Sequence, residues 1–595
     1  METSFPLQQV HAEKRNSSHG SDKDNVHNRS NPSIDILMDS ESTIIDPRLS
    51  YQTRKRVSIL SRLQESIFEN SFEAPSPDSV YATSKFRLTL VMIGLCFGAF
   101  LTYLDMTIVA TALPVIGAEL QSFGDISWVA TSYLLTATAL QPLYGKLADI
   151  FGRLPVLMFA LVTFLVGCTI CGVAQTMLLL IIARGLSGIG SAGMMAMAMI
   201  IVSDLVPLSK RTLFLSVFGA MFALASVSGP LLGGVLTDKV TWRWIFYINL
   251  PIGAVAIVIV LLFLRIPHQR SSLWSKLGRI DYLGTGTLVA GVVFLLLGLM
   301  WGGNTYPWSD VRIITFLSLA AALLVAFVIV ELKVSKEPVI PMYLFANRNT
   351  TLCFSSTFCM GMAIFGTLYY TPVFFNVVHN DTATVAGAKL LPYMLSMVVG
   401  NFISGTVINK TGNYRPILWV GSAMSTVGAG LLTTLNSTST VGHEAGYLLI
   451  AGMGLGLCFQ TLIVVTQTSV PEEDVAVVTA CYSFFQTIGA TIGVAVLSAA
   501  LNNVLRQRLV LVQGLDLNMA LTNPGRVYHM DLDSDQLHQF IDSYVVGIRS
   551  IFRVMIPVCG LIFAFSLGLK HIPLREHVGQ LTRSNEKPGT SDTNV

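Results

Sequence analysis

Residues 145–153 read GKLADIFGR, and residues 405–413 read GTVINKTGN, with glycines at the same two positions of each segment. The second segment begins 260 positions after the first, and glycines also recur 260 positions after Gly229 and Gly233. The chain therefore repeats itself once. Two repeated helical bundles around a shared midplane site are typical of secondary transporters.

The composition places this chain in a membrane. It has 595 residues, of which 52% are hydrophobic and 12% are charged, and its mean hydropathy is +0.61. Soluble domains carry about 25% charged residues, so the composition excludes a soluble enzyme, a secreted disulfide scaffold and a nucleic-acid binder. The net charge of +3 is too small to indicate a polyanionic partner. Cys168 and Cys171 form a CxxC inside an apolar run, and we interpret them as small core residues.

A spanning helix needs about 20 mostly apolar residues, and fourteen stretches satisfy that requirement. They lie near 88–116, 126–147, 155–175, 177–202, 212–236, 244–264, 281–301, 312–332, 350–376, 385–408, 416–435, 445–469, 476–501 and 547–569. The sequence thus predicts an all-α integral membrane protein with fourteen spans.

The short loops between these spans differ in positive charge. With the N-terminus inside, the cytoplasmic loops hold thirteen Lys and Arg, and the opposite loops hold four. The thirteen are Lys146, Arg153, Lys210, Arg211, Arg265, Arg270, Lys276, Arg279, Lys333, Lys336, Arg348, Lys410 and Arg415, and the four are Lys239, Arg243, Arg312 and Lys389. Because positive loops stay inside, both termini are predicted to be cytoplasmic. Sequons at Asn380 and Asn436 then face away from the cytosol as glycosylation candidates.

The repeat and the spans together predict the domain organisation. The predicted segments are a disordered cytoplasmic tail (1–85), a six-helix bundle (86–266), two inserted spans with linkers (267–340), a second six-helix bundle (341–570) containing a non-cytoplasmic loop (502–546), and a cytoplasmic tail (571–595). In the first tail, RKRVS places basic residues before Ser58, which suits a kinase site or a lipid-facing cluster.

Asp105 is the clearest acid at membrane depth, in LTYLDMTIVATALPVI. A charged side chain there costs several kcal/mol and is a functional-site hypothesis by default. Arg184 opens RGLSGIGSAG in span 4 and could pair with it. We expect Asp105 to carry the proton and Arg184 to bias its protonation. The alternatives are a purely structural pair, or a role for Asp204 instead.

One glycine-containing segment suits conformational change. In GKLADIFGR, Gly145 and Gly152 would permit a tight turn, and Asp149 could pair with Arg153, which together would make a conformational latch.

Span 5 carries SVSGPLLGGVL. Its proline would kink the helix and its glycines would admit a neighbouring backbone. The residues concerned are Gly229, Pro230, Gly233 and Gly234.

The candidates for a substrate cavity are uncharged. Tyr369, Tyr370 and Asn376 lie on span 9, and Gln460 and Gln467 lie on span 12. Aromatic walls with a few amides suit amphipathic or weakly cationic molecules. Ordinary helix packing and interhelical hydrogen bonds are the alternative interpretation of each residue.

Several ordered motifs together resemble the major facilitator superfamily. They are LDMTIVATALP around Asp105, GKLADIFGR, RGLSGIG, GPLLGG and the WRWIFYINLPIG that enters span 6. The fourteen spans resemble its drug:proton antiporter branch, and WVATSYLLTATALQPLYGKL is similar to fungal members, which include toxin efflux pumps and vacuolar basic amino acid transporters. The resemblance covers roughly 88–575.

The resemblance implies roles for particular positions. Asp149 and Arg153 would form the latch pair, Arg184 would serve proton coupling, and Gly229-Pro230 would be the antiporter signature. Thr111 stands where many members have Asn, so a polar role at that position does not carry over. In the second half Asn413 stands in place of the loop arginine, and no arginine corresponds to Arg184. The residues for proton coupling would therefore lie in the first half.

These observations predict a proton-coupled exporter of drugs, toxins or metabolites at the plasma membrane. A vacuolar importer of basic amino acids and a transporter-like sensor are the alternatives. No nucleophile–base constellation, metal-ligand cluster or phosphate-binding loop favours an enzyme. We expect a proton gradient instead of a cofactor, no metal, and a monomer whose partners are a small-molecule substrate and the lipid bilayer, without nucleic acid.

Overall fold

A computed structural model describes residues 85–570 and 572, apart from 123–124, 207, 267–275, 304–305, 511, 513–526 and 529–532. All of these residues belong to one compact unit, Pro75–Val595. The predicted tails, with Ser58, lie outside the described residues, except for Lys85 and Ile572.

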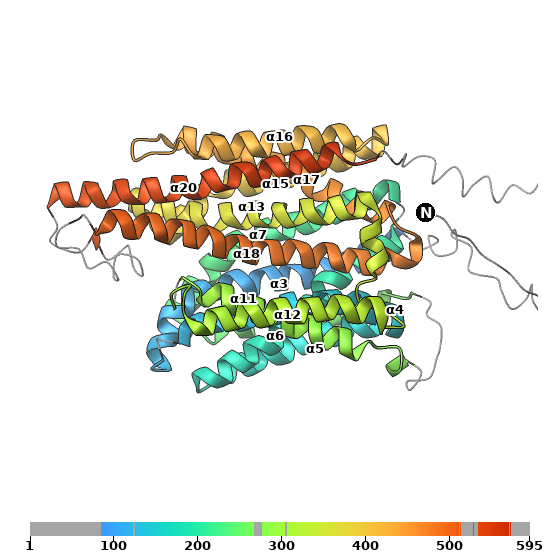
Figure 1. Ribbon diagram of the computed structural model, residues 1–595. Helices are drawn as coiled ribbons and strands as arrows, with labels where there is room; N and C mark the ends of the chain where they lie inside the picture. Colours follow the sequence, from blue (N-terminus) through green and yellow to red (C-terminus); the bar gives the residue numbers. More distant parts are fainter. Residues whose placement is uncertain are drawn as a thin grey trace, which may run out of the picture. The chain divides into compact units, whose positions relative to one another are not determined.

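The described elements are helices (Figure 1). The first half contains α3 (Lys85–Glu119), α4 (Ile126–Phe151), α5 (Arg153–Val173), α6 (Met177–Leu205), α7 (Leu208–Lys239), α8 (Trp244–Tyr247) and α9 (Asn249–Phe263). The insertion contains α11 (Tyr282–Trp301) and α12 (Val311–Lys333). The second half contains η2 (Met342–Ala346), α13 (Arg348–Val378), α14 (Ala383–Lys389), α15 (Leu391–Thr411), α16 (Arg415–Leu432), α17 (Val441–Thr468), η3 (Glu472–Asp474), α18 (Val475–Leu509) and α20 (Ser534–Leu567). The all-α prediction is confirmed.

Among the residues that the structure describes, twelve helices are long and apolar enough to cross a membrane. Of the fourteen predicted spans, those represented by α4 and α16 are not among the twelve. Both are nevertheless long helices, of 26 and 18 residues, and they pack in the bundle against α6 and α17 respectively. The count of fourteen membrane spans stays a prediction.

The two halves pack in the same way. In the first, α3 contacts α7 and α9 while α6 contacts α4 and α5, and in the second α13 contacts α18 and α20 while α17 contacts α15 and α16. The halves meet where α4 contacts α18 and α7 contacts α15. The inserted helices α11 and α12 pack on each other, and α11 also contacts α4 (Figure 1).

One pair of glycines shows how closely the packing repeats. A Cβ on Gly188 would lie 2.3 Å from the carbonyl oxygen of Tyr133, and a Cβ on Gly452 would lie 2.2 Å from that of Tyr393. Each glycine therefore lets α6 or α17 approach the backbone of its neighbour. The tyrosines are 260 residues apart and the glycines 264, so the sequence repeat is also a structural repeat.

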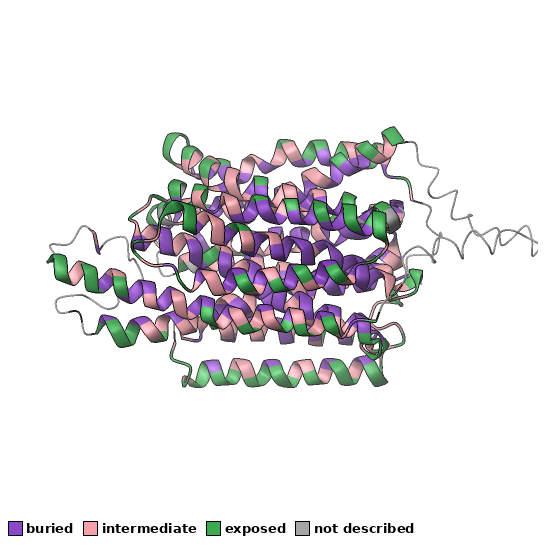
Figure 2. Ribbon diagram, turned by 90° about the horizontal axis from the view of Figure 1, so that it is seen from above, coloured by how far each residue is buried: buried purple, intermediate pink, exposed green. Residues whose placement is uncertain are grey.

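Burial is greatest in the middle of the bundle and least on the outer helices (Figure 2). Helix α12 buries only Ile313, Ala320, Phe327 and Glu331. Large apolar side chains such as Phe159, Ile182 and Leu262 remain exposed. In a spanning helix these surfaces face lipid, which is as apolar as the side chains themselves.

The structure corrects two details of the prediction. Helix α18 continues to Leu509 and α20 begins at Ser534, so much of the predicted loop 502–546 is helical. The reason is that a helix satisfies its own backbone and can continue into water, where Asp533 caps α20. Second, Gly145 lies inside α4 and not in a turn, because only Gly152, with a φ of 96°, interrupts the helices there.

Candidate transport site

A cavity of about 460 Å³ lies between the two halves. Its wall comes from α3, α4, α6 and α7, from α13, α15, α17 and α18, and from the end of α11. The described residues that line it include no Asp, Glu, Lys, Arg or His. Pockets for small molecules measure about 300–1,000 Å³ and combine apolar walls with a few polar groups, so this cavity is the candidate substrate site.

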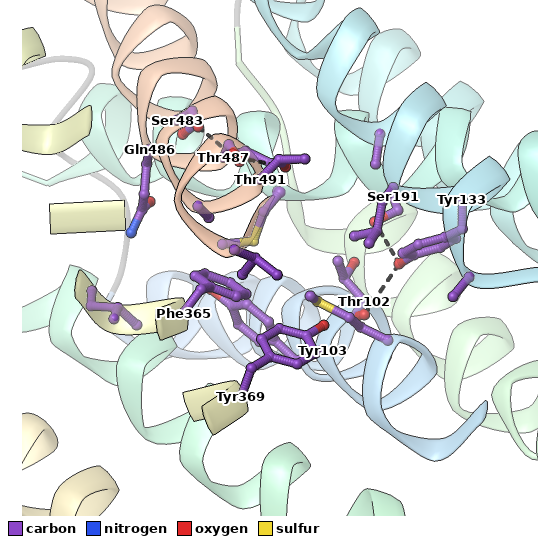
Figure 3. A pocket seen from close by; sticks show the side chains of 18 of the residues that line it. Thr102, Tyr103, Tyr133, Ser191, Phe365, Tyr369, Ser483, Gln486, Thr487 and Thr491 are labelled. Carbon is purple, nitrogen blue, oxygen red and sulfur yellow. Dashed lines mark hydrogen bonds between the residues drawn. The ribbon is translucent and has the colours of Figure 1, made fainter. Parts of the chain in front are cut away.

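Aromatic side chains from three helices form one part of the wall. The rings of Tyr103 on α3 and Phe222 on α7 are 5.0 Å apart between centroids, and Phe365 and Tyr369 on α13 stack at 6.4 Å. Figure 3 shows Tyr103, Phe365 and Tyr369 grouped together. Such a surface can hold a flat aromatic molecule by offset or edge-to-face contacts.

Hydroxyl and amide groups on α18 form another part of the wall (Figure 3). Ser483, Thr487 and Thr491 are spaced four apart, so they share one helix face, and Gln486 lies beside them. The Thr487 hydroxyl is 3.1 Å from Oε1 of Gln141 on α4. These groups can exchange hydrogen bonds with substrate hydroxyls and carbonyls.

Asp105 and Arg184, which the sequence proposed as partners, form a buried ion pair behind this wall. Arg184 Nη1 lies 2.5 Å from Asp105 Oδ2, and the two residues are 1% and 0% exposed. Asn249 Nδ2 is 3.4 Å from the other carboxylate oxygen, and Arg184 Nε donates to the carbonyl of Val129 at 3.1 Å. Neither charged residue lines the cavity. Removing one partner would strand a buried charge, at a cost of about 3–5 kcal/mol.

The predicted latch has an additional member. Arg153 Nη1 is 2.6 Å from Asp149 Oδ1, and its Nε is 2.8 Å from Asp204 Oδ2. Asp204, the alternative proton carrier, is therefore paired at the end of α6. Gly145 faces α18, where its Cβ would lie 2.8 Å from that of Ala480. The segment 145–153 thus joins an ion-pair cluster to a close contact between the halves.

The glycines of the predicted antiporter signature differ in what they contact. A Cβ on Gly229 or Gly233 would come within 2.1–2.5 Å of α3 atoms, whereas Gly234 has nothing within 4 Å. Pro230 lies within the continuous helix α7. Gly229 and Gly233 thus bring α7 against the helix that carries Asp105.

Gln467 joins the halves and does not line the cavity. Its Nε2 donates to Ser203 Oγ at 2.7 Å and to Thr479 Oγ1 at 2.9 Å, and Arg211 Nη1 donates to its Oε1 at 3.1 Å. These bonds lie at the end that carries segment 145–153. The structure is therefore held together at the end predicted to be cytoplasmic.

The other cavity candidates divide by position. Tyr369 and Tyr370 line the cavity, but Asn376 and Gln460 do not. Asn376 donates to the carbonyl of Asp381 at 2.7 Å. Gln460 is buried, and its amide atoms have no hydrogen-bond partner in the described part of the chain.

Sequence reasoning missed the polar groups nearest the cavity. Ser483, Thr487 and Thr491 carried a usable signal, since hydroxyls four apart in an apolar helix mark one polar face. Ser191 lies four positions after Ser187 and carried the same signal, whereas Tyr133, directly after Thr131 and Ser132, has no spacing that sets it apart.

No group of three or more His, Cys, Asp or Glu that could hold a metal occurs among the described residues. Cys168 and Cys171 are free and buried, as their interpretation as core residues predicted. Asn380 is exposed just after α13, and Asn436 follows α16 with its side-chain oxygen accepting from Thr438.

The chain was compared with known proteins. Residues 95–494 match the model of the Major Facilitator Superfamily. The chain belongs to this superfamily. It is 36% identical to the MFS-type efflux pump MFS1 of Arthroderma benhamiae (strain ATCC MYA-4681 / CBS 112371), over 79% of this chain and 88% of that one. It is 40% identical to the efflux pump hmp6 of Hypomyces subiculosus, over 74% and 78% of the two chains.

Two further comparisons agree with this family. The chain is 34% identical to the efflux pump aflT of Aspergillus parasiticus, over 82% of this chain and 96% of the other. The solved structure of the human organic anion transporter MFSD10 shares the fold, with a TM-score of 0.53 at 14% identity over 80% of this chain and 99% of that one. The protein is thus a multi-pass membrane transporter for a small molecule, and not an enzyme.

Proposed function

We propose that this transporter is a proton-coupled antiporter that exports uncharged aromatic drugs, toxins or metabolites across the plasma membrane. The observation that carries the proposal is an uncharged cavity whose wall backs onto a buried Asp105–Arg184 pair. Relatives named as efflux pumps support the direction of transport.

The chemistry of the cavity favours a neutral substrate over a basic amino acid. Lysine or arginine would bring a cationic side chain into a cavity whose described lining has no carboxylate to pair with it. Burying an unpaired charge is costly. A planar molecule with carbonyl or hydroxyl groups along one edge would instead use the aromatic wall and the hydroxyls of α18 together.

Asp105 is the group that would exchange the proton. Protonating its carboxylate removes the charge that holds Arg184, and deprotonation restores the attraction. If each form of the pair favours a different arrangement of the two halves, proton movement down its gradient drives substrate the other way. The membrane potential supplies about 2.3 kcal/mol per charge per 100 mV.

The test uses purified protein in sealed vesicles. Uptake of 1,8-dihydroxyanthraquinone, a flat neutral probe, is measured with an imposed pH gradient alongside uptake of lysine. We expect gradient-driven, saturable accumulation of the anthraquinone and a matching proton flux that Asp105→Asn abolishes. Accumulation of lysine with no response to the anthraquinone would overturn the neutral-substrate proposal, and an unchanged proton flux in Asp105→Asn would overturn the role of Asp105.

A further inference from the structure

Tyr133 on α4 touches both the cavity and the buried ion pair. The side chain lines the cavity although the residue is only 2% exposed. The Arg184 guanidinium carbon lies 4.3 Å from the centroid of its ring. Its hydroxyl lies 2.7 Å from Ser191 Oγ and 3.2 Å from the carbonyl oxygen of Thr102 (Figure 3). Ser191 and Thr102 also line the cavity.

The direction of these hydrogen bonds follows from the chemistry of the groups. The Tyr133 hydroxyl has one hydrogen and donates it to Ser191 Oγ at 2.7 Å, the shorter of its two contacts, with the Thr102 carbonyl at 3.2 Å as a second acceptor. The Ser191 oxygen therefore accepts from Tyr133. A cavity occupant with a hydroxyl group can donate to Ser191 Oγ in place of Tyr133.

The ion pair itself is out of reach of an occupant. Asp105 and Arg184 are fully buried and do not line the cavity. Arg184 is held by Asp105, by the Val129 carbonyl and by the face of the Tyr133 ring. A cation over an aromatic face is stabilised more strongly when it is desolvated, as here.

We propose that Tyr133 is the positioning residue through which an occupant of the cavity acts on the Asp105–Arg184 pair. An occupant that donates to Ser191 Oγ displaces the tyrosine hydroxyl, the ring moves on the guanidinium, and the hold of Arg184 on Asp105 changes. Binding in the cavity is thereby linked to protonation behind its wall. This inference rests on the proposed proton-coupled function.

The titratable neighbours of Asp105 come from three helices. They are Arg184 on α6, Tyr133 on α4, and Cys168 and Cys171 on α5. The neutral amide of Asn249 on α9 completes this environment. Of the neighbours named here, Tyr133 is the one that also lines the cavity.

The second half offers a matched control. Tyr393 on α15 corresponds to Tyr133, since each carbonyl faces the glycine of the neighbouring helix. Tyr393 is buried and its hydroxyl donates to the Ile364 carbonyl at 3.5 Å, but it does not line the cavity. Tyr133→Phe and Tyr393→Phe therefore each remove one buried hydroxyl, and only the first breaks the link to Ser191.

The experiment measures protons taken up or released per bound 1,8-dihydroxyanthraquinone, in weakly buffered detergent solution, and probe-driven proton flux in vesicles. We expect Tyr133→Phe to lower the proton-to-probe ratio, counted per bound probe, about threefold or more, and Tyr133→Leu to lower it about tenfold. Tyr393→Phe should match the wild type.

The outcomes separate the two proposals. An unchanged ratio in both Tyr133 variants, with normal coupling in the wild type, would overturn the role of Tyr133 alone. Equal losses in Tyr133→Phe and Tyr393→Phe would also overturn it, because the effect would then be general packing. A wild type that binds the probe without any proton exchange would overturn the proposed antiport and this inference with it.

Discussion

Helices α6 and α17 occupy matching places in the two halves but differ in charge at one level. Gly188 and Gly452 pack on Tyr133 and Tyr393 with nearly the same geometry. Four residues before each glycine, α6 has Arg184 and α17 has Leu448, both buried. The first half holds an ion pair where the second has an apolar contact.

This difference separates what builds the fold from what the site requires. Small residues let the helices approach, and both halves have them at the same places. A buried ion pair is not needed for packing, because an apolar replacement of similar volume is often neutral or stabilising. Leu448 shows that the architecture accommodates such a residue, so the presence of the Asp105–Arg184 pair in the first half points to function. Four predictions test this comparison.

The largest effect is expected from making the first half resemble the second. Arg184→Leu leaves Asp105 buried without its partner, and we expect it to destabilise the protein by about 3–5 kcal/mol. Asp105→Asn with Arg184→Leu should recover most of that stability but no proton coupling. Thermal unfolding in detergent and proton flux in vesicles measure the two effects.

The matched control for this change is Leu448→Met, a volume-conserving substitution expected to cost under about 1.5 kcal/mol. A double variant as unstable as Arg184→Leu would contradict the view that the pair is dispensable for packing.

A smaller and symmetric effect is expected from the paired glycines. Gly188→Ala and Gly452→Ala each force a Cβ against a tyrosine carbonyl. Overpacking of this kind lowers the free energy of unfolding by about 1–3 kcal/mol. Unfolding temperatures should fall by similar amounts in the two variants. Gly234→Ala, where nothing lies within 4 Å, is the control. A large difference in unfolding temperature between Gly188→Ala and Gly452→Ala would contradict the equivalence of the two contacts.

Gln467 tests the contact between the halves. Ser203 and Gln467 are 264 residues apart, as are Gly188 and Gly452, and their side chains bond to each other. Gln467→Leu removes hydrogen bonds worth about 1 kcal/mol each and should open this end more often. A cysteine placed at Ala480 should then react several-fold faster with a thiol reagent.

The control for that experiment is Gln460→Leu, since Gln460 is buried on the same helix α17 and does not join the halves. Equal labelling of the cysteine in both backgrounds would show that Gln467 does not hold this end closed.

The smallest effect concerns the linker before α13. Glu337 lies 3.2 Å from Lys146 Nζ and 2.6 Å from Arg279 Nε, and the hydrogen bond from Arg279 holds the pKa of Glu337 below its ordinary value. Because this pKa is lowered by folding, the stabilisation is present above the ordinary pKa and is lost as pH falls through the lowered value.

Glu337→Gln should therefore lower the free energy of unfolding by less than about 1 kcal/mol at neutral pH, since the pairs are partly exposed. Below the lowered pKa of Glu337 the substitution should not change the free energy of unfolding. Unfolding measured across pH checks this. At the position 260 residues after Lys146 the second half has Thr406. The ion pair between Lys146 and Glu337 therefore has no counterpart in the second half at that position. Glu472→Gln is the control, because Glu472 is exposed. A cost that persists in acid would mean that the effect is not ionic.

Much of the fold could be predicted because it depends on local pattern. The apolar runs, the repeated glycines and the acid at membrane depth each appear in a short stretch of sequence. The ends of α18 and α20 were predicted less well, since helices continue past the apolar region wherever their backbone and caps permit. Gly145 was assigned to a turn because its role depends on α18, which is distant in the sequence.

The sequence by itself determined that this chain spans a membrane, that it contains two similar halves, and that Asp105 and Arg184 stand out at membrane depth. Only the tertiary structure decided which polar side chains face the cavity. Tyr133 lies against both the cavity and Arg184, while Gln467, predicted to face substrate, joins the halves instead. The physical reason is that successive residues of a helix point about 100° apart. The direction of each side chain therefore depends on how the helix that carries it is rotated about its axis, and packing against neighbouring helices fixes that rotation.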